Sequence, residues 1–162
     1  MTSVAFQHDV GAYLKAEIAL NPEEVSTTDD GSERSGYAVD RQGLGSPCLS
    51  AKLVVPYAAS LAAAETATVK VNLQDVTTTT GTWADYDDKD GSTANTATIG
   101  STASTAAQTV NDVLEVDFDI GSAKRYLRVQ VTPTLTASAT ETDTVDVAAV
   151  IVFGGADVNP AT

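Results

Sequence analysis

The stretch VLEVDFDI, residues 113–120, decides the fold. Apolar and acidic residues alternate strictly along it: Leu114, Val116, Phe118 and Ile120 alternate with Glu115, Asp117 and Asp119. Successive side chains of a β-strand point to opposite faces of the sheet, so this alternation predicts a strand with one face in a core and one in water.

The same period of two recurs on both sides of this stretch. In residues 68–76 we expect Val69, Val71 and Leu73 to point inward, and in residues 126–131 we expect Leu127, Val129 and Val131 to do so. Residues 145–153 are apolar on both faces after Asp146, as in a central strand that is covered on both sides. Further strands are predicted at residues 13–20, with Leu14, Ala16, Ile18 and Leu20 on the inward face, at 49–55, and more weakly at 83–86 and 97–99. For residues 13–20 a short helix is the alternative.

Proline, glycine and alanine mark the expected ends of these segments. Pro56 and Pro133 are expected to end the strands before them, because proline has no N–H for a ladder, and Gly154 and Gly155 are expected to break the last strand. The Ala-rich residues 57–65 are the best local helix candidate.

About eight short strands separated by polar turns predict an all-β fold, an antiparallel jelly-roll sandwich in a single domain over residues 1–162. Residues 21–47 have few large apolar side chains and many glycines. A connection of that length inside one domain is usually functional or disordered. We expect it to be an extended arm that contacts a neighbouring subunit, or alternatively a plain surface loop.

Composition excludes several classes of function. With 9 Lys and Arg against 22 Asp and Glu, the net charge is −13, which disfavours nucleic acid and anionic membranes as partners. His8 is the only histidine, so a histidine-based zinc site or catalytic triad is not expected. Cys48 is single and is expected to be a small buried residue at a strand start. We predict no catalytic residue, no cofactor and no metal, and synthesis in the cytoplasm, since MTSVAFQHDV does not look like a signal peptide.

Two charged clusters are candidate sites. Residues 85–91, DYDDKDG, fail the EF-hand spacing, so a solvated turn is preferred, and a weak cation site at Asp85–Asp90 is the alternative. Lys124, Arg125 and Arg128 form the main basic cluster, which is either solvated or complementary to an acidic protein partner.

Five segments together resemble the Bbp16-type capsid cement proteins of tailed bacteriophages. They are KAEIALNP (15–22), STTDDGSERSGYAVDRQG (26–43), LSAKLVV (49–55), RYLRVQVTP (125–133) and VAAVIVFGGAD (147–157). The resemblance implies a jelly-roll protein on the outer surface of the virion, which binds a major capsid protein of the HK97-like type and bridges capsomers as a homo-oligomer, a dimer or trimer.

Within residues 21–47, the most adhesive side chains are Arg34, Tyr37 and Arg41, which are therefore the predicted partner-binding residues. The alternative function is a β-sandwich that binds carbohydrate or serves as a fibre-type adhesion domain. In that case Trp83, Tyr86 and Tyr126 would be the exposed aromatic residues that contact the sugar.

Overall fold

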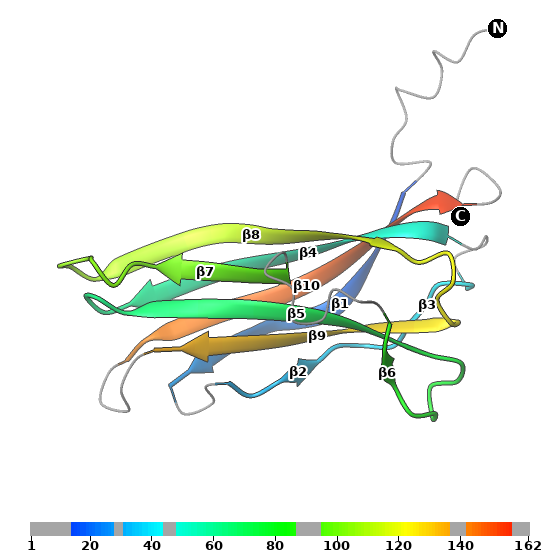
Figure 1. The fold of residues 1–162 in the computed structure, drawn as a ribbon, viewed down its shortest axis with the longest axis horizontal. Coiled ribbons are helices and arrows are strands. Elements are labelled where there is room, and N and C mark those ends of the chain that lie inside the picture. The colour runs from blue at the N-terminus through cyan, green and yellow to red at the C-terminus, as the bar shows by residue number, and fades with distance from the viewer. Residues whose placement is uncertain (1–13, 28–30, 44–47, 87–94, 137–141, 157–162) are drawn as a thin grey trace, which may run out of the picture.

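The computed structural model describes residues 14–27, 31–43, 48–86, 95–136 and 142–156, and these residues form strands and turns without an α-helix (Figure 1). The strands are β1 (Lys15–Ser26), β2 (Arg34–Ser35), β3 (Val39–Asp40), β4 (Cys48–Leu61), β5 (Thr66–Val76), β6 (Ala84–Asp85), β7 (Thr96–Gly100), β8 (Gln108–Asp119), β9 (Tyr126–Leu135) and β10 (Thr144–Ala156). The predicted all-β class is confirmed.

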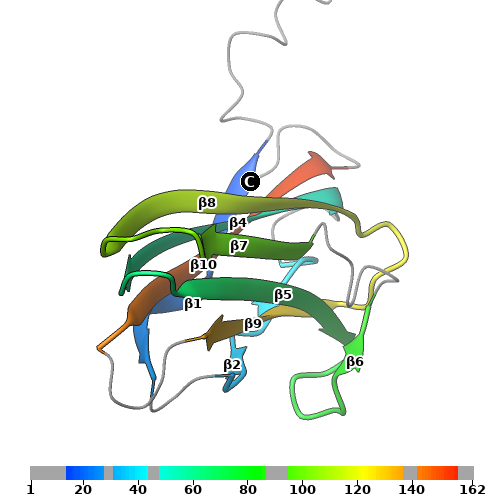
Figure 2. The same cartoon turned by 60° about the vertical axis from the view of Figure 1, so that its left-hand side comes forward.

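The strands form two antiparallel sheets that lie one upon the other (Figures 1 and 2). The first sheet has the order β1-β10-β4-β8 and the second the order β2-β9-β5-β6. The short β3 shares the edge of β9 with β2, and β7 shares the edge of β5 with β6, so each sheet is four strands wide. The chain passes back and forth between the two sheets in the manner of a jelly roll, with β2 and β3 together and β5, β6 and β7 together in the second sheet. This confirms the predicted architecture.

The core lies between the sheets and is made by the inward side chains of every long strand. In β8 these are Val116 and Phe118, followed by Ile120, and in β5 they are Val69, Val71 and Leu73, as the alternation predicts. Cys48 is fully buried at the start of β4, which confirms its predicted place, and burial raises the pKa of its thiol.

The predicted facing of β1 is wrong. Ala16 and Ile18 point to the outer side of the first sheet, and Ile18 is 60% exposed, whereas the adjacent Ala19 is fully buried. The register of β1 against β10 shifts between Ile18 and Leu20, and such a bulge changes which residues face inward. The first half of β1 therefore presents its apolar residues outward, and the second half presents them to the core.

The helix predicted at residues 57–65 is also wrong, because β4 continues to Leu61 with Tyr57, Ala59 and Leu61 buried. Its pairing with β8 extends over the whole of residues 50–61. A short Ala-rich segment is marginal as a helix without packing, whereas here two neighbouring strands bind its backbone.

Two prolines and two glycines lie inside strands that they were predicted to end. In β9 the carbonyl of Pro133 accepts the N–H of Gly31 at 3.0 Å. Both backbone groups of a strand residue point to the same neighbour, so the missing N–H of Pro133 faces the irregular edge and not β5. Pro56 likewise lies within β4, opposite Val113, and β10 continues through Gly154 and Gly155.

The described part of residues 21–47 is not a detached arm. Residues 21–26 complete β1, and β2 and β3 pair with the edge of β9. Val25 and Val39 are buried in the interior of the sandwich. The segment is therefore stabilised by packing its apolar side chains against its own chain. The described residues of this segment therefore lie along the edge of the sandwich, and their role in contacts between subunits stays a prediction.

Candidate interaction surfaces

The segment between β2 and β3 bonds to both sheets at one side of the sandwich. Gly36 N–H donates to Val129 O of β9 at 2.7 Å, and Tyr37 N–H donates to Ala19 O of β1 at 2.7 Å. A Cβ on Gly36 would lie 2.2 Å from Ala19 O, so only glycine permits this approach. We call the surface formed by Asn21, Glu23, Arg34 and Tyr37 around this junction the Tyr37 corner.

Tyr37 is the most prominent side chain of this corner. It is 53% exposed, and its hydroxyl accepts a hydrogen bond from Asn21 Nδ2 at 2.6 Å. Surface hollows of about 420 and 320 Å³ lie beside it, one reaching to Ile18 and Val39 and the other to Leu20 and Pro22. An amphipathic ring held by a hydrogen bond between two hollows is suited to contact with another protein.

Arg34 lies on β2 and forms an ion pair across the corner. Its Nε lies 2.8 Å from Glu23 Oε1 of β1, and its side chain is mostly covered. The neighbouring Glu33 accepts a hydrogen bond from Gln130 Nε2 of β9. Arg34 therefore helps to hold β2 beside β1 as well as lying next to Tyr37.

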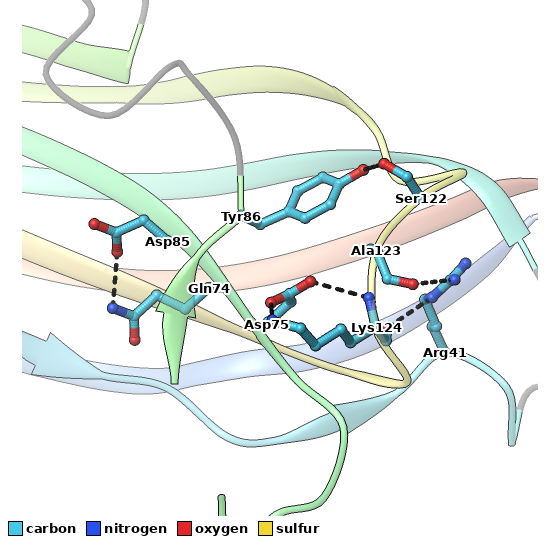
Figure 3. Close-up of polar contacts among 8 residues, drawn as sticks. All are labelled: Arg41, Gln74, Asp75, Asp85, Tyr86, Ser122, Ala123 and Lys124. Atoms are coloured by element: carbon cyan, nitrogen blue, oxygen red, sulfur yellow. Dashed lines mark hydrogen bonds and ion pairs between the residues drawn. The ribbon is translucent and has the colours of Figure 1, made fainter. Parts of the chain in front are cut away.

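Arg41 lies in a different environment from the other two predicted partner-binding residues. It is 6% exposed, and its guanidinium donates to the backbone oxygens of Lys124 at 2.8 Å and of Ala123 (Figure 3). It also donates to the backbone oxygen of Cys48 at 3.0 Å. Those carbonyls come from the start of β4 and from the loop between β8 and β9. Arg41 thus holds the backbone together at one end of the sandwich, whereas the Tyr37 side chain is exposed to solvent.

The predicted basic cluster is engaged within the chain. Lys124 Nζ lies 2.6 Å from Asp75 Oδ1 (Figure 3), and Arg125 binds the Asp40 carboxylate at 2.7 Å, which holds the pKa of Asp40 below its usual value. Arg128 donates to Gln74 Oε1 at 2.8 Å, and its guanidinium lies 4.6 Å from the centre of the Trp83 ring. To bind an acidic partner, these three side chains would have to give up their contacts within the chain and form new ones with the partner.

The outer face of the second sheet contains a polar hollow of about 280 Å³. Its lining is made of Glu33, Lys70, Val71, Asn72, Gln74, Asp85, Gln130 and Thr132. The Asp85 carboxylate accepts hydrogen bonds from Gln74 at 2.9 Å (Figure 3) and from Asn72 at 2.6 Å, and these bonds lower the pKa of Asp85. Amide and carboxylate groups of this kind bind water or the hydroxyls of a polar ligand.

The aromatic residues named for carbohydrate binding lie near this face but already have partners. Arg128 covers one side of Trp83, and Arg125 lies 5.1 Å from the centre of the Tyr126 ring. Tyr86 is half-buried, and its hydroxyl donates to Asp119 O at 2.8 Å (Figure 3 shows its further contact with Ser122). The structure does not assemble these three rings into an open platform.

Within the described ranges, no three His, Cys, Asp or Glu side chains lie together as metal ligands. Of the alternative cation site, only Asp85 and Tyr86 belong to that part of the chain, and residues 87–90 lie outside it. Among the same described residues there is no helix that could span a membrane.

No protein-family model and no curated protein matches the chain. Among solved structures, the chain is similar to one of infectious bursal disease virus Gx strain, with 7% identity and a TM-score of 0.48, and to one of the Gt strain, with 7% identity and a TM-score of 0.43. Each match covers 91% of this chain and 33% of the other, so this chain spans about a third of their length.

A third match is a cryo-EM structure of the giant freshwater prawn Macrobrachium rosenbergii extra small virus VLP. It has 15% identity and a TM-score of 0.21, and it covers 86% of this chain and 79% of the other. All three are therefore structures of viral particles or viral proteins. Because these sequence identities and TM-scores are low, the fold is assigned from the strand order of this chain and not from the matches.

The sequence predicts Tyr37 as a partner-binding residue but gives no sign that Ile18 and Asn21 lie beside it. Ile18 was assigned to the core because its alternation with Lys15 and Glu17 fits a simple strand. Only the bulge after Ile18, which depends on pairing with β10, places it outside. The dipeptide Ser35-Gly36 indicates a turn or loop at this point of the sequence. Nothing in the neighbouring residues shows that the backbone of Ala19 comes so close to Gly36.

Proposed function

We propose that this protein is a structural component of a virion, a decoration or cement protein on the outside of a tailed-phage head. It binds the major, HK97-like capsid protein and bridges capsomers as a homo-oligomer, without catalysis. The observation that carries this proposal is the strand order β1-β10-β4-β8 upon β2-β9-β5-β6, which is the jelly roll that the sequence resemblance implies. The capsid surface as location and the bacterial cytoplasm as place of synthesis are parts of the same proposal.

The mechanism is mechanical. A rigid sandwich touches two capsomers at once, and many such contacts, repeated by the symmetry of the head, add to the free energy needed to separate the capsomers. The net charge of −13 suits a position outside the shell, because packaged DNA is also a polyanion. No part of this mechanism requires a bound cofactor.

The Tyr37 corner is the contact surface that we assign to the capsid protein. Tyr37 is exposed, anchored by Asn21, and carried on a segment whose backbone is fixed to both sheets. Such a preorganised aromatic side chain loses little conformational entropy on binding. Arg34 supports the corner through Glu23, whereas Arg41 would act on binding only by keeping the fold intact.

Co-sedimentation with expanded heads that lack the protein tests this proposal. We expect saturable binding at a fixed ratio to the capsid subunit, and we expect Tyr37→Ala to weaken it by about 30-fold or more, the effect of losing an interface hot spot. Thr98→Ala, an exposed position on β7, is the matched control and should bind as the parent does. Absence of binding at every salt concentration would refute the cement role, and equal binding by Tyr37→Ala would remove the corner from it.

A second candidate function, carbohydrate binding or fibre-type adhesion, is favoured by the polar hollow on the second sheet. Asn72, Gln74 and Asp85 form a connected hydrogen-bonding set there, with Trp83 at a neighbouring position. A glycan-binding screen with Asn72→Ala as the comparison tests it. Binding that depends on Asn72, together with no affinity for heads, would replace the first proposal with the second.

A further inference from the structure

The outer side of the first sheet carries a continuous apolar surface. Cross-strand pairs place its members side by side: Ala16 with Val152, Ile18 with Val150, Val150 with Val54, and Pro56 with Val113. We call this surface the apolar face, and it consists of Ala16, Ile18, Val54, Pro56, Ala58, Val113, Ala148, Val150 and Val152.

The described residues leave this face open to solvent. Ile18 is 60% and Val113 41% exposed, and Val54, Val150 and Val152 are each partly exposed. Strand β10 is apolar on both sides, a pattern typical of a strand that is covered on both sides. Its inner side is buried in the core, so the strand lacks a cover only on the outside.

Charged residues border the apolar face on β8 and at both of its ends, and Glu115 of β8 lies in register with Val54. At one corner Lys52 is bound to Glu115 at 3.0 Å and to Asp117 at 3.1 Å, and at the other end Glu24 pairs in register with Asp146. An apolar patch with a polar rim is typical of a protein–protein interface.

We propose that a second copy of this chain covers the apolar face, so that two molecules pack through their first sheets. The proposal gives a surface to the homo-oligomer that is part of the proposed function, although its formation needs no capsid. The natural cover of a flat apolar sheet is another such sheet, packed about 10 Å away. This chain supplies that partner itself.

The face has the self-complementary relief that a two-fold interface needs. In such an interface the same patch serves both partners, so it must contain both projections and hollows. Ile18 projects from β1, and a hollow of about 230 Å³ lies on the same face, lined mainly by Pro22, Pro56, Ala58 and Ala148 with Asp146 at its rim. The projection of one copy thus has an apolar hollow to occupy in the other.

The size of the face also fits a dimer. Taken with its polar rim, the face spans four strands about 4.8 Å apart and the nine residues 52–60 of β4 at about 3.4 Å each, a flat footprint of about 20 by 30 Å. The apolar residues at positions 54–58 of β4 occupy about half of that length. The whole footprint is about 600 Å² before the relief of the side chains is added, and a stable interface buries about 800 Å² of accessible surface on each partner.

The charge of the chain predicts how salt will act on the dimer. Two copies repel each other with 13 net negative charges each, while the centre of their contact is uncharged. Salt screens this repulsion, so association should become stronger as salt is added. A basic partner on the same face would show the opposite dependence.

Sedimentation equilibrium of the full chain, over a range of protein and salt concentrations, tests the proposal. The chain of 16.7 kDa should reach twice this mass, with a dissociation constant that falls as salt rises. The double variant Val113→Glu/Ala148→Glu should raise that constant at least 100-fold, because it places charges within the apolar contact. Thr98→Glu/Thr134→Glu, with equal added charge on exposed positions of the second sheet, is the control and should dimerise as the parent does.

Thiol labelling of Val113→Cys identifies which surface is covered. The native Cys48 is buried, so labelling should slow with rising protein concentration at position 113 and not in the control Thr134→Cys. If position 113 is protected from labelling in the dilute monomer, and deletion of residues 1–13 removes this protection, then that segment covers the face and the proposal is overturned. If the chain stays monomeric, and position 113 is protected only when the protein is bound to heads, then the capsid protein covers the face and the proposal is overturned.

Failure of this proposal and failure of the proposed function give different results. The Val113→Glu/Ala148→Glu variant should be monomeric and still bind heads through Tyr37, with lower avidity. Tyr37→Ala should be dimeric and bind heads poorly. A dimer that is unchanged by the face variant would refute the inference while leaving the head-binding result untouched.

Discussion

The outer faces of the two sheets are built from equally regular strands but have opposite chemistry. On the first sheet Val150 lies between the aliphatic residues Ile18 and Val54, and charged residues appear only on the edge strand β8 and at the ends. On the second sheet Asn72, Gln74 and Gln130 form a network of amides with Asp85. Both sheets bury their inner faces alike, so the fold requires neither outer chemistry. This difference supports the proposal that water covers the second sheet and that another apolar surface covers the first.

The two sides of β10 give the largest expected contrast. Ile151→Ala should lower the free energy of unfolding by about 3–4 kcal/mol, because Ile151 is fully buried in the core and its loss leaves a cavity. Val150→Ala, one residue away and facing outward, should cost less than about 1 kcal/mol in the dilute monomer. Urea denaturation below the dissociation constant measures both. Equal costs would mean that the isolated chain already covers its outer side.

The junction between the two sheets is the next most sensitive place. Gly36→Ala should destabilise the chain by about 2–3 kcal/mol, since the new Cβ would collide with Ala19 O, and either β1 or β2 must move away. Gly121→Ala is the matched control, because the only atom near its Cβ belongs to the flexible Asp119 side chain. Thermal denaturation compares them, and a neutral Gly36→Ala would contradict the close approach of the sheets.

The fold was largely predictable because its signal is local and repeated. Alternation in β5 and β8 correctly indicated inward and outward residues, and from such strands and their polar turns the jelly roll followed. What could not be predicted depends on contacts distant in sequence. The bulge in β1 is set by β10, and the strand at residues 57–61 is stabilised by β8 and β10 rather than by its own alanines.

The candidate site shows the same limit more sharply. Arg34 and Arg41 look alike in the sequence, each in a polar stretch with glycine nearby. Arg41 is buried only because the backbone oxygens of Ala123 and Lys124, more than eighty residues away, turn toward it. The apolar face was visible in part, since the two apolar sides of β10 were recognised, but its extent required the register of four strands.

The stability of the chain should depend on pH through Asp85, which lines the polar hollow on the second sheet. Hydrogen bonds from Gln74 and Asn72 lower the pKa of Asp85 in the folded state, so its contribution to stability is present above the unfolded pKa and is lost as pH falls through the folded one. Asp85→Asn should therefore be less stable than the parent at pH 7, by less than about 1 kcal/mol for so exposed a carboxylate, and equally stable near pH 2. Urea denaturation at both values measures this, and a difference independent of pH would assign the effect to shape rather than charge.

A reciprocal pair of nearly isosteric changes gives the smallest and most selective test of the comparison. Val54→Thr adds a hydroxyl at the centre of the apolar face, where a second copy would remove it from water without a partner, so the dimer dissociation constant should rise about threefold. Thr132→Val makes the opposite change beside the polar hollow and should leave that constant as it is. Both variants should keep the stability of the monomer within about 0.5 kcal/mol. If Val54→Thr leaves the dimer unchanged while Thr132→Val strengthens it, the chain associates through its second sheet, and the apolar face must find its cover elsewhere.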